Sequence, residues 1–388
     1  MSFQTELNAW PEDRVRALIE GATADDVDRA LCRDDRSPRD LAALLSRQAA
    51  PRLESMAQEA NRLTRWHFGR TIGLYAPLYI SNVCGADCTY CGYAVRSGNR
   101  EKRRTLTAEE IHSECEALAS HGFQSVLLLT GEARRAVPVA YIADAVAIAH
   151  TYFPSVSVEI YSLDEQDYRV LVDRGLEGVT LYMETYHRDT YAKVHLIGEK
   201  TDYGFRLDAI ERAGRAGARR LSVGSLLGLY DWRVDAFWTL MHARHVQRAC
   251  WQSAVSLSFP RLIHTPARFQ GDTLIRDREL VQLMLAARLF VPEAGFNLST
   301  RERPEFRDKL IPLGVTMMSA GSSTRPGGYS LYGEETLEQF EIEDTRAPRE
   351  VAEVIRASGY DPVWKDFDRG FNNEIHVTSH RFHEAPPN

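Results

Sequence analysis

Ile72-Gly-Leu-Tyr-Ala-Pro-Leu-Tyr79, followed after four intervening residues by Cys84-Gly-Ala-Asp-Cys88-Thr-Tyr-Cys91, is the stretch that decides the fold. The first part has the apolar and aromatic composition of a buried strand. The second is a C-x3-C-x2-C loop whose thiolates are soft ligands for an iron–sulfur cluster or for zinc. A closed zinc site needs a fourth nitrogen or sulfur ligand, and the nearest along the chain are His67, His112 and Cys115. Three cysteines on a four-iron cubane would leave one iron open for an outside ligand, while chance spacing and a structural zinc site stay open as alternatives.

Short apolar runs alternate with helical stretches from residue 71 onward. The candidate strands are residues 72–79, 125–129, 155–161, 178–182, 221–224, 254–259, 297–300 and 315–318. Between them, Thr107-Ala-Glu-Glu110 forms a capping box, and Gly122 and Gly217 stand where helices are expected to end. Eight strand–helix units in series predict an α/β fold, a closed (β/α)8 barrel of the TIM type.

Three parts are expected along the chain. Residues 1–70 read as an N-terminal helical extension, in which Ser37-Pro38 starts a helix with a cap residue and a first-turn proline. Residues 71–330 form the barrel. Residues 331–388 are predicted to pack on the barrel as a C-terminal segment that closes its side or base.

Composition excludes several classes of protein. The 388 residues are 44% hydrophobic and 26% charged, with a formal net charge of −7, which argues against general nucleic-acid binding. No signal-peptide pattern opens the chain, and no apolar run approaches about 18 residues. We therefore expect no membrane association and a cytoplasmic location, where the six cysteines would be reduced thiols.

Polar residues gather where the predicted strands end. Because the carboxyl ends of barrel strands meet at one face and hold the substrate in barrel enzymes, these residues are expected to share one site. They are Cys84, Cys88, Cys91, Thr130, Gly131, Glu132, Glu159, Tyr161, Ser162, Glu184, Tyr186, Gly228, Tyr230, Arg261, Arg301, Ser319 and Gly321.

Several longer motifs carry a resemblance to a known family. They are residues 76–82, 84–93, 129–132, 184–187, 232–233, 258–262, 298–301, 319–322, 326–329 and 362–366. Together they resemble 2-iminoacetate synthase, the radical S-adenosylmethionine (SAM) tyrosine lyase family of thiamine thiazole biosynthesis, over about residues 23–368. The resemblance implies the barrel of the radical SAM superfamily.

The same resemblance implies the chemistry. Cys84, Cys88 and Cys91 would hold a 4Fe–4S cluster whose open iron binds SAM. Reductive cleavage of SAM to methionine and a 5′-deoxyadenosyl radical would be followed by hydrogen abstraction from L-tyrosine, at its amino group. Breaking the Cα–Cβ bond would then give 2-iminoacetate (dehydroglycine) and p-cresol.

Residues matching the family's motifs are expected to bind SAM. Tyr90 would pack near the adenine, and Glu132 would accept from the SAM ammonium. Arg206 would bind the SAM carboxylate with its planar donors, although a helix-surface charge is the alternative. Glu159 and Glu184 are the candidates for the ribose hydroxyls.

The amino-acid substrate has its own expected residues. Arg301 is expected to bind the tyrosine carboxylate, with a loop salt bridge as the alternative, and Tyr79 and Ser319 would complete the site. Two departures from the family pattern bear on substrate choice: Met183 replaces a glutamine, and Ile263 replaces a basic residue.

The remaining cysteines exclude one relative. Cys32, Cys115 and Cys250 are isolated and are predicted to be small buried hydrophobic residues. No cysteine follows Cys250, so the chain lacks the C-terminal cluster of the tyrosine lyase that matures FeFe-hydrogenase.

Partners are implied by the family and by charge. Thiazole synthase would receive the product. The basic loop of Arg96, Arg100, Lys102, Arg103 and Arg104 is either a solvated charge run or a docking site for flavodoxin or ferredoxin.

His187 and His195 are predicted to be loop or surface histidines. A lyase for tryptophan, and a zinc-stabilised scaffold for thiazole synthase, are the competing functions.

Overall fold

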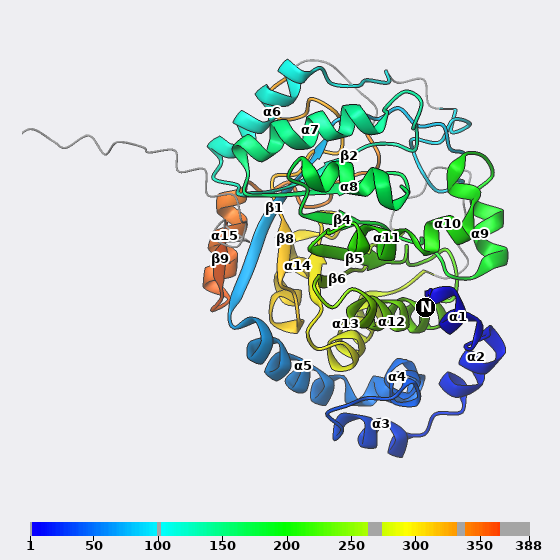
Figure 1. Ribbon diagram of the computed structural model, residues 1–388. Coiled ribbons are helices and arrows are strands. Elements are labelled where there is room, and N and C mark those ends of the chain that lie inside the picture. Colours follow the sequence, from blue (N-terminus) through cyan, green and yellow to red (C-terminus); the bar gives the residue numbers. More distant parts are fainter. Residues whose placement is uncertain (1, 99–101, 263–273, 332–337, 365–388) are drawn as a thin grey trace, which may run out of the picture.

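A closed barrel of eight parallel strands forms the centre of the protein in a computed structural model, which describes residues 2–98, 102–262, 274–331 and 338–364. Each strand pairs with the next, and β1 pairs with both β2 and β8. The strands are β1 Thr71–Tyr79, β2 Ser125–Leu129, β3 Ser155–Glu159, β4 Gly178–Thr180, β5 Arg220–Gly224, β6 Ala254–Ser258, β7 Gly295–Leu298, β8 Met317–Ser319 and β9 Asp361–Val363. The predicted (β/α)8 barrel is confirmed (Figure 1).

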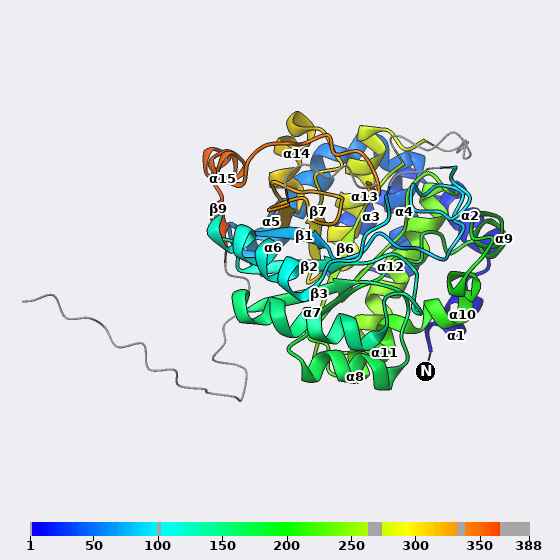
Figure 2. The same ribbon diagram turned by 90° about the horizontal axis from the view of Figure 1, so that it is seen from above.

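Helices surround the barrel, and Figure 2 shows α4 and α5 on the side opposite α7 and α8. The α-helices are α1 Phe3–Asn8, α2 Glu12–Glu20, α3 Ala24–Leu31, α4 Pro38–Leu45, α5 Leu53–Phe68, α6 Ala108–Ser120, α7 Val139–Tyr152, α8 Glu165–Asp173, α9 Arg188–Val194, α10 Tyr203–Leu207, α11 Ala209–Arg215, α12 Trp232–Ala249, α13 Asp277–Phe290, α14 Pro304–Leu310 and α15 Pro348–Ala357. Three 3-10 turns are η1 Arg47–Arg52, η2 Glu199–Thr201 and η3 Ile311–Leu313.

Local signals in the sequence set the helix ends. Thr107 and Glu110 form the predicted capping box at α6, with Thr107 N–H donating to the Glu110 carboxylate at 2.8 Å. Ser37 and Asp40 cap α4 in the same way. Gly122 and Gly217 have φ of 91° and 105°, a left-handed conformation that glycine adopts without strain and that ends α6 and α11.

The N-terminal helices pack on the barrel's outer layer. α5 packs on α13, and α4 packs on α12 and α13. At the start of the chain, the Phe3 ring stacks on His242 at 4.4 Å, and its backbone N–H donates to Glu211 at 2.9 Å. These contacts bury Phe3 completely and fix α1 against α12.

The last described part of the chain differs from its prediction. The helix predicted at 351–357 is present as α15, and β9 adds a parallel strand beside residues 71–73 of β1, which the sequence did not predict. Residues 339–341 line the central cavity at the carboxyl ends of the strands. The described part of this segment therefore reaches the carboxyl-end face of the barrel as well as its side. No helix in the described ranges is long and apolar enough to cross a membrane.

Candidate active site

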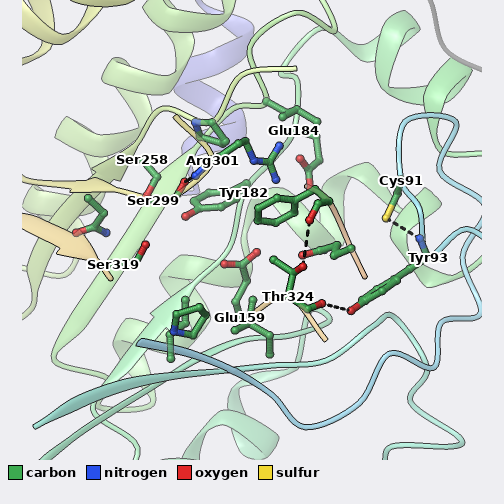
Figure 3. A pocket seen from close by; sticks show the side chains of 18 of the residues that line it. Cys91, Tyr93, Glu159, Tyr182, Glu184, Ser258, Ser299, Arg301, Ser319 and Thr324 are labelled. Atoms are coloured by element: carbon green, nitrogen blue, oxygen red, sulfur yellow. Dashed lines mark hydrogen bonds between the residues drawn. The ribbon is translucent and has the colours of Figure 1, made fainter. Parts of the chain in front are cut away.

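A cavity of about 440 Å³ opens at the carboxyl ends of the strands (Figure 3). Every residue predicted for cluster, SAM and substrate lines this one cavity: Cys84, Cys88, Cys91, Tyr90, Glu132, Glu159, Glu184, Arg206, Arg301, Tyr79 and Ser319. Strand ends and the loops after them supply these residues, so the barrel brings together side chains that are over 200 positions apart. Of the seventeen strand-end residues predicted to share one site, ten line this cavity. The prediction is wrong for the other seven, which are Tyr161, Ser162, Tyr186, Gly228, Tyr230, Arg261 and Gly321.

The cysteine loop is held by a second segment, residues 194–198. Thr89 N–H donates to Val194 O at 3.0 Å, and Leu196 N–H donates to Asp87 O at 2.9 Å. Cys88 and His195 thereby form an antiparallel bridge. Gly198 passes the loop so closely that a Cβ there would lie 3.0 Å from Ala86 Cα. The loop's shape is therefore set by backbone pairing.

His195 is buried behind the cysteine loop, which corrects the prediction of a loop or surface histidine. Its Nδ1 lies 2.9 Å from Tyr191 O, and its Nε2 lies 2.8 Å from the Tyr90 hydroxyl. Because a carbonyl can only accept, Nδ1 carries the proton and Nε2 accepts from Tyr90. Burial, together with the charges of Lys200 and Arg206, lowers the pKa of His195 to about 2, so the ring is neutral. The ring orients Tyr90 toward the cavity.

His187 also has a structural role. Its ring stacks on Tyr230 with centroids 4.0 Å apart, and its Nε2 lies 3.1 Å from the Glu12 carboxylate. It joins α2 to the loops after β4 and β5 and does not line the cavity.

The three thiols fit an iron–sulfur cluster better than a single zinc ion. Burial raises the pKa of all three, that of Cys91 to about 11, so cationic irons would be needed to keep them as thiolates. Within the described ranges, no three His, Cys, Asp or Glu side chains are gathered closely enough to hold one metal ion. In a cubane, by contrast, separate irons take the separate cysteines.

Two ion pairs form the wall next to the cysteine loop. Arg206 Nη1 lies 2.8 Å from Glu132 Oε1, and Lys200 Nζ lies 2.7 Å from Glu184 Oε1. Arg206 also lies 3.7 Å from Glu184 and donates to Tyr182 O. Burial opposes the charge of Arg206, but Glu132 and Glu184 raise the pKa of its guanidinium above the usual value. Arg206 is 5% exposed, so the helix-surface alternative is wrong.

Glu184 has a strained backbone, with φ of 66° in a residue that is not glycine. The loop after it is held by Asp235 of α12, which accepts from Tyr186 N–H at 2.9 Å and from the Thr185 hydroxyl at 3.1 Å. Leu226 N–H donates to Glu184 O at 2.7 Å. These bonds offset the strain and aim the carboxylate into the cavity.

Residues from the far wall and the tail shape the other half of the cavity. The Arg301 guanidinium stacks over the Phe340 ring at 3.8 Å. Tyr79 donates its hydroxyl to Gln339 at 2.5 Å, and Ser319 Oγ accepts from Thr300 N–H at 3.0 Å. Among described residues, Arg301 forms no ion pair, which disfavours the alternative of a loop salt bridge.

Sequence reasoning missed several residues of the site. Lys200 lies in a short turn between β4 and β5 with no recognisable motif, and only its place behind the cysteine loop reveals it. Gln339 and Phe340 come from the tail, whose position could not be read from local pattern. Tyr182 follows β4 and lines the cavity, so its strand-end position was an available signal.

Other predicted residues have mixed outcomes. Cys115 and Cys250 are buried as predicted, but Cys32 is exposed at the end of α3, so that prediction is wrong. In the basic loop, Arg103 donates to the carbonyls of Asn82 and Tyr93, and Arg104 pairs with Glu110. Met183 is buried. Arg100 and Ile263 lie outside the described residues.

Comparison with known proteins places this geometry in a family. Residues 78–243 match the Radical SAM superfamily, and residues 258–361 match the Biotin and Thiamin Synthesis associated domain. The chain is 44% identical to the 2-iminoacetate synthase of Salmonella typhimurium over 370 residues, 94% of this chain and 97% of that protein. The chain belongs to the 2-iminoacetate synthase family. The Escherichia coli 2-iminoacetate synthase is likewise 44% identical, over 92% of this chain and 94% of its own.

Solved structures agree with membership of the 2-iminoacetate synthase family. The crystal structure of HydG, a maturase of FeFe-hydrogenase, has a TM-score of 0.84 and 32% identity, covering 91% of this chain and 80% of that one. HydG from Carboxydothermus hydrogenoformans has a TM-score of 0.79 and 27% identity, covering 93% and 81%. Methylornithine synthase, at 22% identity and a TM-score of 0.68, shares the fold.

Proposed function

We propose that this protein is a radical SAM lyase that cleaves the Cα–Cβ bond of L-tyrosine, giving 2-iminoacetate and p-cresol for thiamine thiazole biosynthesis. The observation that carries the proposal is one cavity with three cysteines at one side and, at the other, the guanidinium of Arg301, which has no ion-pair partner among the described residues. A cofactor site and an amino-acid site would thus share a single cavity. Identity of 44% over nearly the whole chain to two 2-iminoacetate synthases supports the same reaction.

A 4Fe–4S cluster and SAM, when bound, supply the one-electron chemistry that this reaction needs. Cys84, Cys88 and Cys91 would hold the cluster. Arg206 and Glu132 would bind the carboxylate and the ammonium of SAM, exchanging part of their mutual ion pair for these contacts. Tyr90, oriented by His195, would pack against the adenine.

The far wall and the tail would hold the substrate. Arg301 would take the carboxylate of tyrosine, and Tyr79 and Ser319 would complete the site. Phe340 and Gln339 cover Arg301 and Tyr79, which excludes water from the reacting groups. A dry cavity protects a reactive imine from hydrolysis before release.

The test is an anaerobic assay of reconstituted protein with SAM, a reductant and L-tyrosine. We expect p-cresol and 5′-deoxyadenosine together, and no indole product when tryptophan replaces tyrosine. Arg301→Lys keeps the charge but loses the planar pair of donors, so it should still cleave SAM while p-cresol formation falls by about tenfold or more. Unchanged p-cresol output from this variant would contradict the role of Arg301.

Flavodoxin or ferredoxin is the proposed reductant, and its docking surface lies over the cysteine loop. Val95 and Leu196 are exposed apolar residues whose backbone N–H groups bond to the adjacent Ala86 and Asp87 of that loop. Arg96 is exposed beside them. An acidic partner could therefore approach the cluster through an apolar patch with a basic rim.

Charge reversal tests this docking surface. Arg96→Glu should slow reduction by flavodoxin and reduce its dependence on salt, without changing reduction by dithionite. Equal rates of reduction by flavodoxin for the wild-type protein and Arg96→Glu would exclude this docking surface.

Thiazole synthase is proposed as the acceptor of the product, and co-purification of thiazole synthase with this protein would test it.

A further inference from the structure

The charged side chains of the cavity do not all have partners. Five carboxylates and three cationic groups line it. Of the carboxylates, Glu302 is paired with Arg261 and Glu341 is exposed to solvent. Glu132 is paired with Arg206, and Glu184 is paired with Lys200. Two groups that are not exposed remain, the carboxylate of Glu159 and the guanidinium of Arg301, and neither forms an ion pair or a side-chain hydrogen bond with any residue in the described part of the chain.

Successive side chains of β3 point alternately outward and inward, and this alternation directs Glu159 into the cavity. Val156 and Val158 are fully buried on the outer side of the strand, so Ser157 and Glu159 face the barrel interior. Arg301 follows β7 on the other side of the barrel. Figure 3 shows both side chains directed into the same space, with Tyr182 between them.

Opposite unpaired charges in one buried space match a zwitterion. An amino acid would bring a carboxylate to Arg301 and an ammonium to Glu159, so that each of these half-buried charges gains a partner. The ribose hydroxyls of SAM are neutral and would leave the charge of Glu159 without a partner, which is costly in a site shielded from water. Glu184, already held beside the cysteine loop by Lys200, is the better placed of the two for the ribose.

We propose that Glu159 is a catalytic residue that binds the ammonium group of the substrate amino acid and accepts a proton from it. This rests on the proposed amino-acid lyase function. In the transfer, one ammonium N–H bond breaks and an O–H bond forms on the carboxylate. The electron pair stays on nitrogen, leaving a neutral amine and a neutral carboxylic acid, so no oxidant or reductant is consumed.

The surroundings of Glu159 suit a proton acceptor. Burial, followed by the charge of Glu184, raises the pKa of Glu159 to about 7, while Arg301, Lys200 and Arg206 oppose the rise. The hydroxyls of Tyr75, Tyr79 and Tyr182 also feel the charge of Glu159, and their own pKa values are raised by burial, so they stay protonated. A neutral amine still carries the N–H hydrogens from which abstraction would start.

Binding of three ligands to reconstituted protein with SAM, but without reductant, tests the first half of the proposal. The ligands are L-tyrosine, tyramine (no carboxylate) and 3-(4-hydroxyphenyl)propanoate (no amino group). Glu159→Gln should weaken L-tyrosine and tyramine by at least about tenfold and leave the propanoate unchanged. Arg301→Gln should do the reverse, weakening L-tyrosine and the propanoate and leaving tyramine unchanged.

Contrary results are equally specific. If Glu159→Gln weakened SAM binding and left tyramine unchanged, Glu159 would belong to the nucleoside and the proposal would be wrong. Glu159→Asp keeps the charge and gives a second variant if the first fails to fold. If wild-type protein bound tryptophan but not tyrosine, tyrosine lysis would fail, and tryptophan, tryptamine and 3-(indol-3-yl)propanoate would test Glu159 in the same way.

A pH profile tests proton transfer itself. At saturating L-tyrosine, p-cresol formation by Glu159→Gln should be reduced at neutral pH and partly recover as the pH approaches the pKa of the free amino group, since the substrate then needs no acceptor. A defect that stays constant across this range would overturn proton transfer and leave only binding.

Discussion

Replacing Lys200 by methionine removes one partner of a buried ion pair while keeping the length of the side chain. In the wild-type protein, Lys200 Nζ lies 2.7 Å from Glu184 Oε1, and the two side chains are 9% and 12% exposed. Breaking a buried pair by removing one partner costs about 3–5 kcal/mol. Arg206 still lies 3.7 Å from Glu184, and Lys200 no longer has to be desolvated, so we expect a loss below this range, of about 2 kcal/mol.

The loss should depend on pH. Burial tends to raise the pKa of Glu184, but Lys200 and Arg206 outweigh it and hold that pKa below the usual value. Ionised Glu184 therefore stabilises the wild-type fold above the unfolded pKa, and this stability is lost as the pH falls through the folded pKa. In Lys200→Met the folded pKa rises, so the deficit should be full at neutral pH and shrink in acid.

Urea unfolding of the cluster-free protein at several pH values measures both effects. With about 2.1 cal/mol/K of unfolding entropy per residue over 388 residues, 2 kcal/mol also corresponds to a fall in Tm of about 2.5 °C. Lys193→Met is the matched control, because Lys193 is exposed on α9. A deficit of the same size at every pH would show that Glu184 does not sense Lys200 and would refute the reasoning.

Three further outcomes can be checked directly. Asp235→Ala leaves two buried donors of the loop after β4 without an acceptor and should cost about 2–4 kcal/mol in urea unfolding, whereas the asparagine variant keeps an acceptor and should lose less. Because burial raises the pKa of Asp235 to about 7, the wild-type protein should lose stability as the pH rises through that value, and the asparagine variant should lose less over the same range. Tyr90→Phe removes the hydrogen bond to His195 and should cost about 1 kcal/mol while iron content stays at the wild-type level; loss of iron would contradict an orienting role. Cys88→Ala should abolish iron binding and p-cresol formation but keep the fold, as judged by circular dichroism, with Cys32→Ala as the control that retains both.

The barrel could be predicted because each strand is a short apolar run between capping and stop signals. Thr107 begins α6, and Gly122 and Gly217 end α6 and α11, where the sequence indicates. The later strands shifted by about two residues: β7 begins at Gly295 and β8 at Met317, because pairing with neighbours decides the ends of such short strands. β9 was not predicted because a strand of three residues is too short to show an alternating pattern of apolar and polar residues.

The residues of the candidate site also divide into those that the sequence predicted and those that it missed. Residues just after strands were found, since the topology of a parallel barrel places them together. Lys200, Gln339 and Phe340 were not, because they reach the cavity from a turn and from the tail, whose paths depend on tertiary packing. His195 looked like a surface residue because its burial comes from pairing with the cysteine loop, over 100 residues away.

The anchored start of the chain has a practical consequence. Ser2 donates to Asp208, and Phe3 is locked between His242 and the edge of Tyr186, two residues beyond the strained Glu184. An affinity tag fused directly before Ser2 would lie at the back of the loop that carries the Glu184 carboxylate into the cavity. Purification handles on this end should therefore be joined through a spacer or cleaved off before cofactor affinity is compared between variants.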